Sequence, residues 1–305
     1  MKKRLALFDL GTNTFNLLVC DVENGSFTEI YNTKFPVKLG EGGLANNLLL
    51  PRAMERGIMA LRTAVYEITN LGCDSVLAIG TAALRDAKNA KEFTDSVMEQ
   101  LNIDIEIIDG LREADLIYKG VKASNVLNQD CDLIMDIGGG SVEFILGDKD
   151  QAHEVFSFNA GVAKLLQKFD PTEPIQTEEI SKIHAFLDKT FTPLIEAVKT
   201  HKPSRLVGSS GSFDSVRDMI VESKTLAPKL SEHMVSRELF QEIYESIISK
   251  TKEERFEIPG LVPLRVDYIV MAVILMDYIQ TKFGFNGFIQ CDYALKEGLL
   301  IENLQ

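Results

Sequence analysis

The sequence predicts an α/β protein built from two related domains that face each other across a cleft. The first observation behind this prediction is a repeated unit of strand, Asp-x-Gly turn and strand, over residues 4–22 and again over 132–147. The second is the alternation of short apolar strands with amphipathic helical stretches through the rest of the chain. A polar segment at 123–129 offers a hinge, so we expect domains of residues 1–124 and 125–305.

The first domain is expected to open with a three-stranded meander, in which Asn24-Gly25 is a strong signal for a two-residue hairpin turn. A long helix follows, opened by Pro51 and closed by Gly72, and its apolar residues recur at alternating spacings of four and three. Short apolar strands and a second amphipathic helix complete the domain. The predicted ranges in chain order are 4–9, 15–22, 26–35, 51–71, 75–79, 103–108 and 111–122.

The second domain is expected to repeat the meander, with a turn at 148–150, and then to alternate helices with strands. Its closing helix can lean back on the first domain. A helix is expected to start within 158–165, and the later predicted elements are helix 178–200, strand 205–207, helices 237–250 and 265–281, strand 287–291 and helix 293–303.

The glycine-rich turn at 136–141 is the most informative stretch of the sequence. Asp136 leads into three glycines and Ser141. Consecutive glycines can aim several backbone N–H groups at one point, which creates an anion-binding nest. Asp136 suits a cation or its waters, and Ser141 offers a hydroxyl group. An ordinary glycine-rich hairpin explains this stretch equally well when it is taken alone.

The N-terminal turn has the same design. Superposing Asp9 on Asp136 places Gly11 on Gly138, Thr14 on Ser141 and Asn16 on Glu143. Two related turns that face each other could clamp a phosphate and a metal ion from both sides. The pair is therefore a more specific signal than either turn alone.

Three further places in the sequence are candidates for the site: the segment from Thr81 to Arg85, Glu113 and the turn at 208–212. Thr81 follows a strand and precedes a helix, which is a natural place for an anion, and Arg85 lies one helical turn later. Taken alone, Arg85 is better explained as a surface arginine paired with Asp86 or a neighbour. Glu113 lies in the first turn of its predicted helix, where the helix dipole alone could explain it. The small-residue turn GSSGS at 208–212 fits close helix–strand packing as well as it fits ligand contact.

The composition excludes several classes of function. A net charge of −13 argues against a nucleic-acid binder, which normally presents a basic face. The apolar run 268–276 is too short to cross a bilayer, and MKKR leads directly into a strand without a signal-peptide pattern, so we expect a cytoplasmic protein with no membrane contact. The four cysteines show no CxxC spacing, which favours reduced thiols, and the four histidines form no metal-binding spacing.

The charge is distributed unevenly. Residues 1–124 carry 14 basic and 17 acidic side chains, whereas residues 125–305 carry 18 and 28. Any basic surface that contacts a ligand with several phosphates must therefore be local. Magnesium carried with such a ligand would relieve part of the repulsion.

These motifs resemble those of the exopolyphosphatase/guanosine pentaphosphate phosphohydrolase family, and the similarity covers essentially the whole chain. The family belongs to the superfold of actin, the sugar kinases and the heat-shock chaperone ATPases, so the resemblance implies two actin-like (ribonuclease H-like) domains with a catalytic cleft between them. The motifs that carry it are DLGTNTFNLL at 9–18, GTAALRDA at 80–87, DGLREADLIYKGV at 109–121, DIGGGSVE at 136–143, GSSGS at 208–212, ERFEIPGLVPLRVD at 254–267 and CDYALKEGLL at 291–300.

The resemblance assigns roles to residues of this chain. Glu113 matches the glutamate that acts as the base toward water, and Glu143 is a second catalytic candidate that could also be a hydrogen-bonded glutamate at a sheet edge. Asp136 and Glu143 are expected to hold Mg²⁺ or another divalent cation, directly or through water. The expected phosphate-binding residues are Gly11, Thr12, Asn13, Thr14, Thr81, Arg85, Gly138, Gly139, Gly140 and Ser141, with Asp9, Ser209, Gly211 and Arg265 as possible further contacts.

The chain departs from the family pattern at three positions. Asn16 and Lys164 stand where arginines are usual, so one phosphate-binding charge is missing and one bidentate contact is replaced by a point charge. Arg112 stands where many members have a second acidic residue before the catalytic glutamate.

The resulting hypothesis is an exopolyphosphatase that removes terminal orthophosphate from inorganic polyphosphate. Guanosine pentaphosphate phosphohydrolase is the alternative with the same chemistry. A kinase of the same superfold and a non-catalytic polyphosphate or alarmone sensor are further alternatives. The resemblance also suggests a homodimer.

Overall fold

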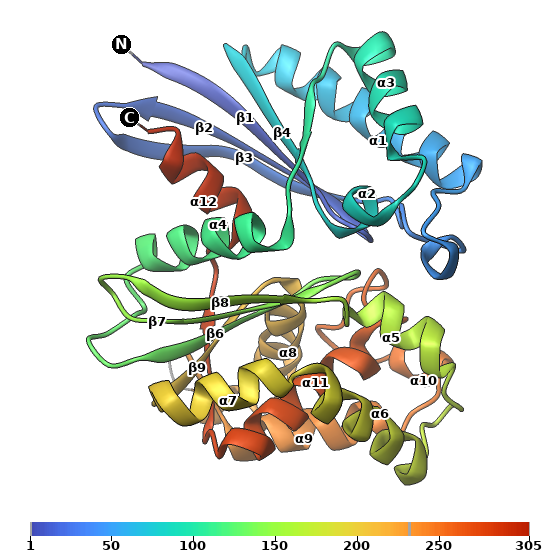
Figure 1. The fold of residues 1–305 in the computed structure, drawn as a ribbon, viewed down its shortest axis with the longest axis vertical. Helices are drawn as coiled ribbons and strands as arrows, with labels where there is room; N and C mark the ends of the chain where they lie inside the picture. The colour runs from blue at the N-terminus through green and yellow to red at the C-terminus, as the bar shows by residue number, and fades with distance from the viewer. Residues whose placement is uncertain (1, 231–232, 305) are drawn as a thin grey trace.

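The structure is a computed structural model that describes residues 2–230 and 233–304. These residues form two β-sheets, one in each half of the molecule, with helices on their outer faces and two helices between them (Figure 1). The strand orders are β3-β2-β1-β4-β5 and β10-β11-β9-β6-β7-β8. The predicted α/β class with two related sheets is confirmed.

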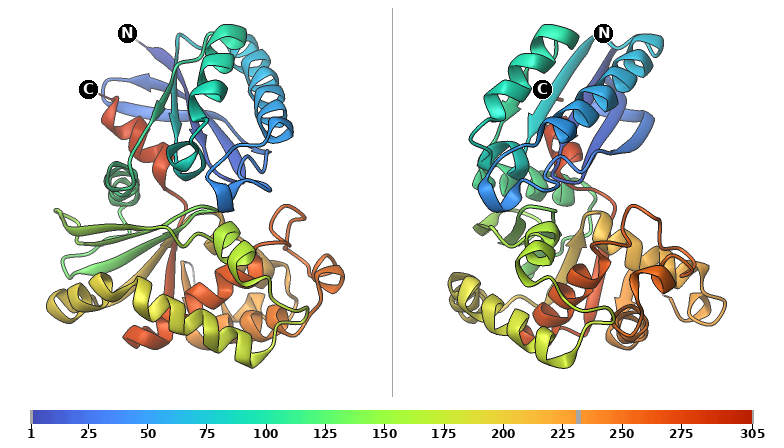
Figure 2. Two further views of the ribbon diagram at one scale, coloured as in Figure 1. Left: turned by 45° about the vertical axis from the view of Figure 1, so that its right-hand side comes forward. Right: turned by 90° about the vertical axis from the view of Figure 1, so that its right-hand side faces the viewer.

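The first sheet begins with an antiparallel meander, as predicted, and adds two parallel strands. Helices α1 and α3 lie side by side on one of its faces (Figure 2). The elements of this half are β1 Lys3–Leu10, β2 Thr14–Glu23, β3 Ser26–Pro36, η1 Leu44–Asn46, α1 Pro51–Asn70, β4 Ser75–Gly80, α2 Ala82–Asp86, α3 Ala90–Leu101, β5 Ile105–Ile107 and α4 Gly110–Ala123.

The second sheet repeats the meander and packs its outer face on a large helical layer. The elements of this half are β6 Asp132–Ile137, β7 Val142–Gly147, β8 Ala152–Phe158, α5 Val162–Phe169, α6 Thr177–Thr190, α7 Thr192–His201, β9 Arg205–Ser209, α8 Gly211–Glu222, η2 Ala227–Lys229, β10 Met234–Ser236, α9 Arg237–Ile248, α10 Lys252–Arg255, α11 Ile269–Phe283, β11 Gly287–Cys291 and α12 Leu295–Glu302.

The single helix predicted over 178–200 is wrong, because the chain forms α6 and α7 with a break at Phe191. Pro193 lies in the first turn of α7 and has no N–H to donate to the preceding turn. The hydroxyl of Thr192 donates to the carbonyl of Lys189 instead, at 3.0 Å. Helices α3 and α8 and strand β10 were not among the predicted elements.

Helices α4 and α12 lie between the two sheets and bury apolar side chains against both. The core here joins Leu7 of β1 and Ile134 of β6 to Leu116 and Val121 of α4. Burying each such side chain stabilises the fold by roughly 1.5–3 kcal/mol. The first turn of α4, which carries Glu113, is therefore held in place by both halves of the molecule.

The two helices cross where each presents a glycine. A Cβ on Gly298 of α12 would lie 1.8 Å from the carbonyl oxygen of Leu116, and a Cβ on Gly120 of α4 would lie 2.1 Å from that of Ala294. No larger residue fits at either position without moving the backbone. The final helix thus packs on α4 and β1, as the sequence suggested, while the domain boundary after residue 124 stays a prediction.

All four cysteines are free thiols. None of the helices within the described ranges has both the length and the apolar character that a membrane span requires.

Candidate active site

The two Asp-x-Gly turns have the same backbone geometry. The N–H of Gly11 donates to the carbonyl of Thr14 at 3.0 Å, and the N–H of Gly138 donates to the carbonyl of Ser141 at 3.0 Å. In the strands that flank each turn, Asp9 lies opposite Asn16 and Asp136 lies opposite Glu143, as the superposition predicted.

This geometry corrects one part of the expectation. The N–H groups of Gly11 and Gly138 are used inside their own turns, so they are not free to bind an anion. The next N–H groups are free: within residues 2–230 and 233–304, no hydrogen bond is donated by the backbone N–H of Thr12, Asn13, Gly139 or Gly140. Each turn therefore offers two free donors.

Backbone N–H groups from neighbouring segments donate hydrogen bonds to the carbonyl groups of the turns. Those of Gly138, Gly139 and Gly140 accept hydrogen bonds from the backbone at the start of α5, which satisfies N–H groups that a helix leaves free in its first turn. Gly161 is required there, because a Cβ would lie 2.5 Å from the carbonyl of Gly139. In the other turn, the carbonyl of Asn13 accepts from the N–H groups that follow β3.

The two turns touch across the gap between the halves of the molecule. A Cβ on Gly139 would lie 2.7 Å from Nδ2 of Asn13, and one on Gly140 would lie 2.8 Å from Oγ1 of Thr12. Glycine at these positions therefore permits a close approach of one turn to the other.

A single cavity opens between the turns, and most of the predicted site residues line it. Those that do are Asp9, Gly11, Thr12, Asn13, Thr14, Thr81, Glu113, Asp136, Gly138, Gly139, Gly140, Ser141, Gly211 and Arg265. Arg85, Glu143 and Ser209 do not line it. Asp9 and Asp136 thus share one cavity with Glu113.

Glu113 lies at this cavity in the first turn of α4, whose N-cap Asp109 accepts the N–H of Arg112 at 2.8 Å. Glu113 is 7% exposed, and its carboxylate accepts a 2.8 Å hydrogen bond from Nη1 of Arg85. Burial, reinforced by the negative charge of Glu143, raises the pKa of Glu113 well above its usual range, while Arg85 opposes that shift.

Arg85 is half-buried between the two halves of the molecule. Besides Glu113 it reaches Oγ of Ser141 at 3.4 Å, and it lies 3.9 Å from Asp86, the surface partner that the sequence left open. It lines an adjoining groove with Ser141 and Ser157 rather than the cavity of Thr81. A common phosphate contact for Thr81 and Arg85 therefore stays a prediction.

Asp136 and Glu143 form a buried acidic pair on neighbouring strands. Asp136 is 8% exposed, and burial followed by repulsion from Glu113 raises its pKa well above the usual range. Glu143 is 1% exposed and accepts a 2.7 Å hydrogen bond from Oγ of Ser157. Burial and then the charge of Asp136 raise the pKa of Glu143 to about 7.

The two acidic residues differ in their access to a ligand. Asp136 lines the cavity, whereas Glu143 lies behind it. No group of three or more His, Cys, Asp or Glu residues in the described part of the chain is arranged to hold a metal ion. Mg²⁺ commonly uses one or two carboxylates together with waters and substrate phosphates, so of this pair Asp136 is the one that fits the pattern as a direct ligand.

The turn GSSGS combines the two alternatives that the sequence left open, which are close packing of a helix on a strand and contact with the ligand cavity. Gly208 is a packing glycine, because a Cβ would lie 2.1 Å from the ring of Phe213. Gly211 lines the cavity beside Arg265, whose Nη2 would lie 1.9 Å from a Cβ there. Ser210 also lines the cavity, and its φ of 99° and ψ of 161° belong to a region that is normally restricted to glycine.

Ser209 does not contact the cavity, contrary to the expectation of a direct contact. It is fully buried, and its hydroxyl lies 3.3 Å from the carboxylate of Asp136 and 3.1 Å from the carbonyl of Tyr293. It therefore positions the carboxylate of Asp136 from the side that faces away from the cavity.

Arg265 lines the cavity without a partner of its own. Its side chain makes no hydrogen bond or ion pair with any residue that the structure describes. Burial lowers the pKa of its guanidinium, and the charges of Asp214 and Asp136 oppose this change. A half-buried, unpaired guanidinium at a cavity is suited to bind an anion.

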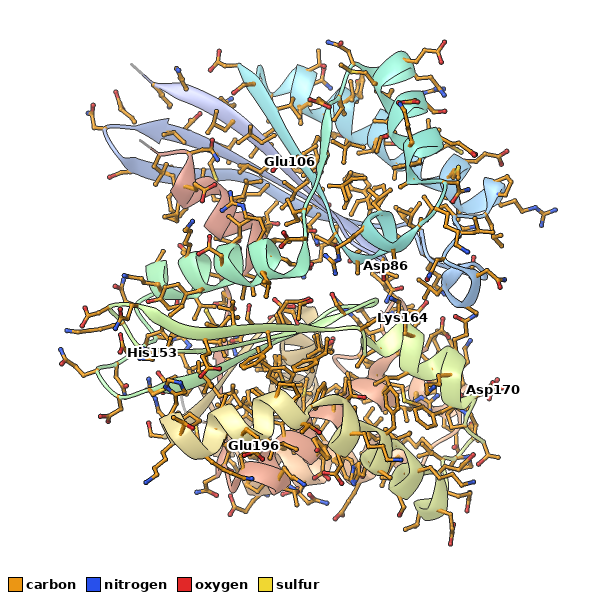
Figure 3. The ribbon with its side chains drawn as sticks, in the orientation of Figure 1. Asp86, Glu106, His153, Lys164, Asp170 and Glu196 are labelled. Carbon is orange, nitrogen blue, oxygen red and sulfur yellow. The ribbon has the colours of Figure 1, made fainter. Side chains whose placement is uncertain are left out.

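Asn16 and Lys164, which replace usual arginines, both have local partners. Asn16 donates to the carboxylate of Asp9 at 2.8 Å, and burial raises the pKa of Asp9 to about 6 despite that bond. Lys164 of α5 pairs with Asp86 of α2 and also donates to Asn159. Figure 3 shows Lys164 and Asp86 facing each other between the two halves.

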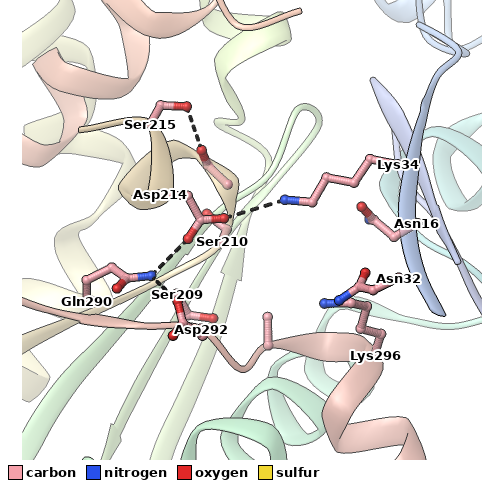
Figure 4. Close-up of polar contacts among 12 residues, drawn as sticks. Asn16, Asn32, Lys34, Ser209, Ser210, Asp214, Ser215, Gln290, Asp292 and Lys296 are labelled. Carbon is pink, nitrogen blue, oxygen red and sulfur yellow. Dashed lines mark hydrogen bonds and ion pairs between the residues drawn. The ribbon is translucent and has the colours of Figure 1, made fainter. Parts of the chain in front are cut away.

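The sequence reasoning missed a group of polar residues at the far end of the cavity. There Lys34 of β3 lies 3.5 Å from Asp214 of α8, and Nε2 of Gln290 donates to Asp214 at 3.0 Å and to Asp292 at 2.7 Å (Figure 4). The missed residues that line the cavity are Lys34, Ser210, Asp214, Asp292 and Lys296.

A β-bulge in β3 is the reason that Lys34 lines the cavity. From the Asn24-Gly25 hairpin, β2 and β3 pair in simple register as far as Cys20, which lies opposite Glu29. The next residue of β2, Val19, lies opposite Tyr31, so Ile30 is the unpaired residue of the bulge. This extra residue brings Lys34 opposite Asn16. Counting from the hairpin without the bulge would have placed Thr33 there, so register reasoning alone could not find Lys34.

The chain is similar to proteins of known structure over almost its whole length. A solved structure of an exopolyphosphatase from Cytophaga hutchinsonii is 33% identical, covers 99% of this chain and 98% of its own, and superposes with a TM-score of 0.94. A Ppx/GppA enzyme from Aquifex aeolicus is 23% identical, with 99% and 100% covered and a TM-score of 0.80. An exopolyphosphatase-like protein is 24% identical, with 99% and 97% covered and a TM-score of 0.87.

The family resemblance seen in the motifs, and the actin-like fold that it implies, are thereby confirmed. The sequence model of the Ppx/GppA phosphatase family matches residues 18–305, which include Glu113, the second Asp-x-Gly turn and Arg265. This chain belongs to the Ppx/GppA phosphatase family.

Proposed function

We propose that the protein is an exopolyphosphatase, which hydrolyses the terminal phosphoanhydride bond of inorganic polyphosphate and releases orthophosphate. The observation that carries the proposal is the cavity in which the two turns and Glu113 meet. Four free backbone N–H groups, two from each turn, can surround a terminal phosphoryl group. Placing a phosphoryl group among fixed donors is the main task of an enzyme that transfers it.

Glu113 is the residue that we assign to the attacking water. Its carboxylate is buried at the cavity, and its raised pKa makes it a stronger base than an exposed glutamate. In this role it accepts a proton from the water as the water attacks phosphorus. Arg85 holds the carboxylate in position and lies close enough to Ser141 to reach a phosphoryl oxygen bound there.

A divalent cation, which we propose to be Mg²⁺, would be held by Asp136, with Ser209 orienting the carboxylate and Glu143 acting through water. When bound, the cation neutralises charge on the phosphoryl oxygens. Burial raises the pKa of both Asp136 and Glu143, and repulsion from Glu113 and Asp136, respectively, adds to these shifts. A bound cation would oppose both shifts.

Inorganic polyphosphate is favoured over guanosine pentaphosphate by the lining of the cavity. None of the residues that line it, among those that the structure describes, is aromatic, so no ring is available to stack on a guanine base. The exopolyphosphatase of Cytophaga hutchinsonii, at 33% identity, points the same way. Guanosine pentaphosphate phosphohydrolase is the second candidate, because its chemistry at the terminal phosphate is the same.

A substrate panel tests the proposal. Orthophosphate release would be measured from long polyphosphate, tripolyphosphate and guanosine pentaphosphate, each with and without magnesium. We expect magnesium-dependent release, fastest from polyphosphate. Preference for guanosine pentaphosphate would support the second candidate, and ATP turnover that requires an added acceptor would indicate a kinase. Binding of all three substrates without release would indicate a sensor.

We propose two further properties, namely a cytoplasmic location and a homodimer. Both follow from the family resemblance and from the sequence. Light scattering of the purified protein tests the second, since a monomer mass would reject it.

A further inference from the structure

Lys34 occupies a distinctive position relative to the N-terminal turn. It lies next to Asn16, which in turn lies next to Asp9, so the three form a row across β3, β2 and β1 at one end of the sheet. All three line the same cavity as the turns. Among the described residues before 125, Lys34 is the only lysine or arginine that lines it.

The current partner of Lys34 holds it weakly. Its ammonium group lies 3.5 Å from the carboxylate of Asp214, and the two side chains are 43% and 33% exposed. Ion pairs as exposed as this one contribute little stability. Asp214 has a second donor in Gln290, at 3.0 Å, so its carboxylate keeps a hydrogen bond when Lys34 moves away (Figure 4).

The other cations at the cavity come from the second half of the chain. Lys296 is paired with Glu297 at 2.7 Å, and Arg265 has no partner among the described residues. Lys34 faces them from β3, the outermost strand of the first sheet, two strands beyond Asp9. Lys34 therefore lies in the same cavity as a terminal phosphate bound by the turns, on the β3 side of that cavity.

We propose that Lys34 binds the phosphate next to the terminal one, and that it exchanges Asp214 for this phosphate when the substrate enters. Lys34 is thus a specificity-determining residue that selects substrates with at least two linked phosphates. It supplies from β3 the positive charge that Asn16 lacks on β2. This inference rests on the proposed function, because it takes the terminal phosphate to be bound by the two turns.

The proposed exchange of partners predicts opposite effects on KM for substitutions of Lys34 and of Asp214. Lys34→Met should lower the ratio of kcat/KM for tripolyphosphate to kcat/KM for p-nitrophenyl phosphate, which has one phosphate, by about tenfold or more, the size of one charge-assisted hydrogen bond. The loss should lie in KM. Lys34→Arg should restore most of the ratio. Asp214→Asn should lower the KM for tripolyphosphate, because Lys34 no longer has to leave a partner.

Lys38→Met is the matched control. Lys38 forms a 2.7 Å ion pair with Asp267 between the two halves of the molecule, but it does not line the cavity. We expect its kinetic constants to equal those of the wild type. If Lys38→Met changes the ratio as much as Lys34→Met does, or if Lys34→Met slows both substrates equally, the proposed contact is rejected.

A binding measurement separates this inference from the proposed function. If the wild type releases no phosphate from any substrate, the exopolyphosphatase assignment fails, and calorimetry with tripolyphosphate still tests Lys34. Weaker binding by Lys34→Met than by Lys38→Met supports the contact. Equal dissociation constants for the wild type and Lys34→Met overturn it.

Discussion

Glu113 and Arg85 are joined by a 2.8 Å hydrogen bond between Oε2 of the carboxylate and Nη1 of the guanidinium, although they lie on separate helices, α4 and α2. The pair fixes a buried acid at the edge of the cavity while leaving it beside the two turns. A base toward water needs such a defined position, since proton transfer requires hydrogen-bond distance.

Replacing Glu113 by glutamine should therefore remove chemistry rather than structure. We expect turnover to fall by about 10²- to 10⁴-fold, with the melting temperature and the affinity for polyphosphate nearly unchanged. Asp115→Asn changes an exposed acid on the same helix and should keep full activity. Turnover of Glu113→Gln within a few-fold of the wild type would remove Glu113 from the mechanism.

Replacing Asp136 by asparagine tests the proposed cation site. We expect the magnesium concentration for half-maximal activity to rise at least tenfold, because a neutral amide is a poor ligand for a hard cation. Ser209→Ala, which removes only the hydroxyl beside Asp136, should cause a smaller rise in the same direction. Activity of the wild type that survives complete chelation of divalent cations would contradict the cation role.

The glycines at the contact between α4 and α12 should tolerate no larger residue. Gly298→Ala places a Cβ against the carbonyl of Leu116, so we expect a loss of about 1–3 kcal/mol in the free energy of unfolding, as for an overpacked core. Turnover should also fall, because α4 carries Glu113. Lys122→Ala, on an exposed part of α4, should change stability by less than about 0.5 kcal/mol. Denaturant unfolding and phosphate release measure the two effects.

The ionic contacts of Glu302 predict a pH dependence of stability. Hydrogen bonds from Arg112 and Lys119 lower the pKa of Glu302 to about 2. A carboxyl whose pKa is lowered by folding stabilises the protein fully above its ordinary pKa, and this stabilisation is lost as the pH falls toward the folded value. The stability advantage of the wild type over Glu302→Gln should therefore be constant near neutral pH and shrink from about pH 4.5 toward pH 2.

Thermal unfolding of both proteins across this range measures that difference. Arg112→Gln is the matched partner variant. The difference in stability between the wild type and Arg112→Gln should also shrink at low pH, but by a smaller amount, since Lys119 still pairs with Glu302. A difference that stays constant from pH 6 to pH 3 would show that the pair contributes no pH-dependent stability.

The features that the sequence predicted well are local ones. The turns after Asp9 and Asp136 were predicted because each is written in a few adjacent residues, and their equivalence followed from superposing those residues. The antiparallel pairing of each turn's strands follows from the short connection between them. Two related sheets and the cavity between their turns could therefore be anticipated.

The features that were missed depend on distant parts of the chain. Nothing adjacent to Arg85 indicates that its main partner is Glu113, 28 positions later, because that contact exists only once α2 and α4 pack together. Ser209 and Ser210 are neighbours, and only the left-handed backbone at Ser210 decides which of them reaches the cavity. Pro193, by contrast, was a visible signal for the break between α6 and α7.

The extra residue at Ile30 has a consequence for how such sites diverge. Because side chains alternate along a strand, pairing the same sequence without the bulge would turn every later side chain of β3 to the other face, and Thr33 would replace Lys34 beside Asn16. A shift of strand pairing by one residue would thus alter the charge of the pocket as effectively as a substitution. Relatives aligned by letters alone could keep this lysine and still have lost its use.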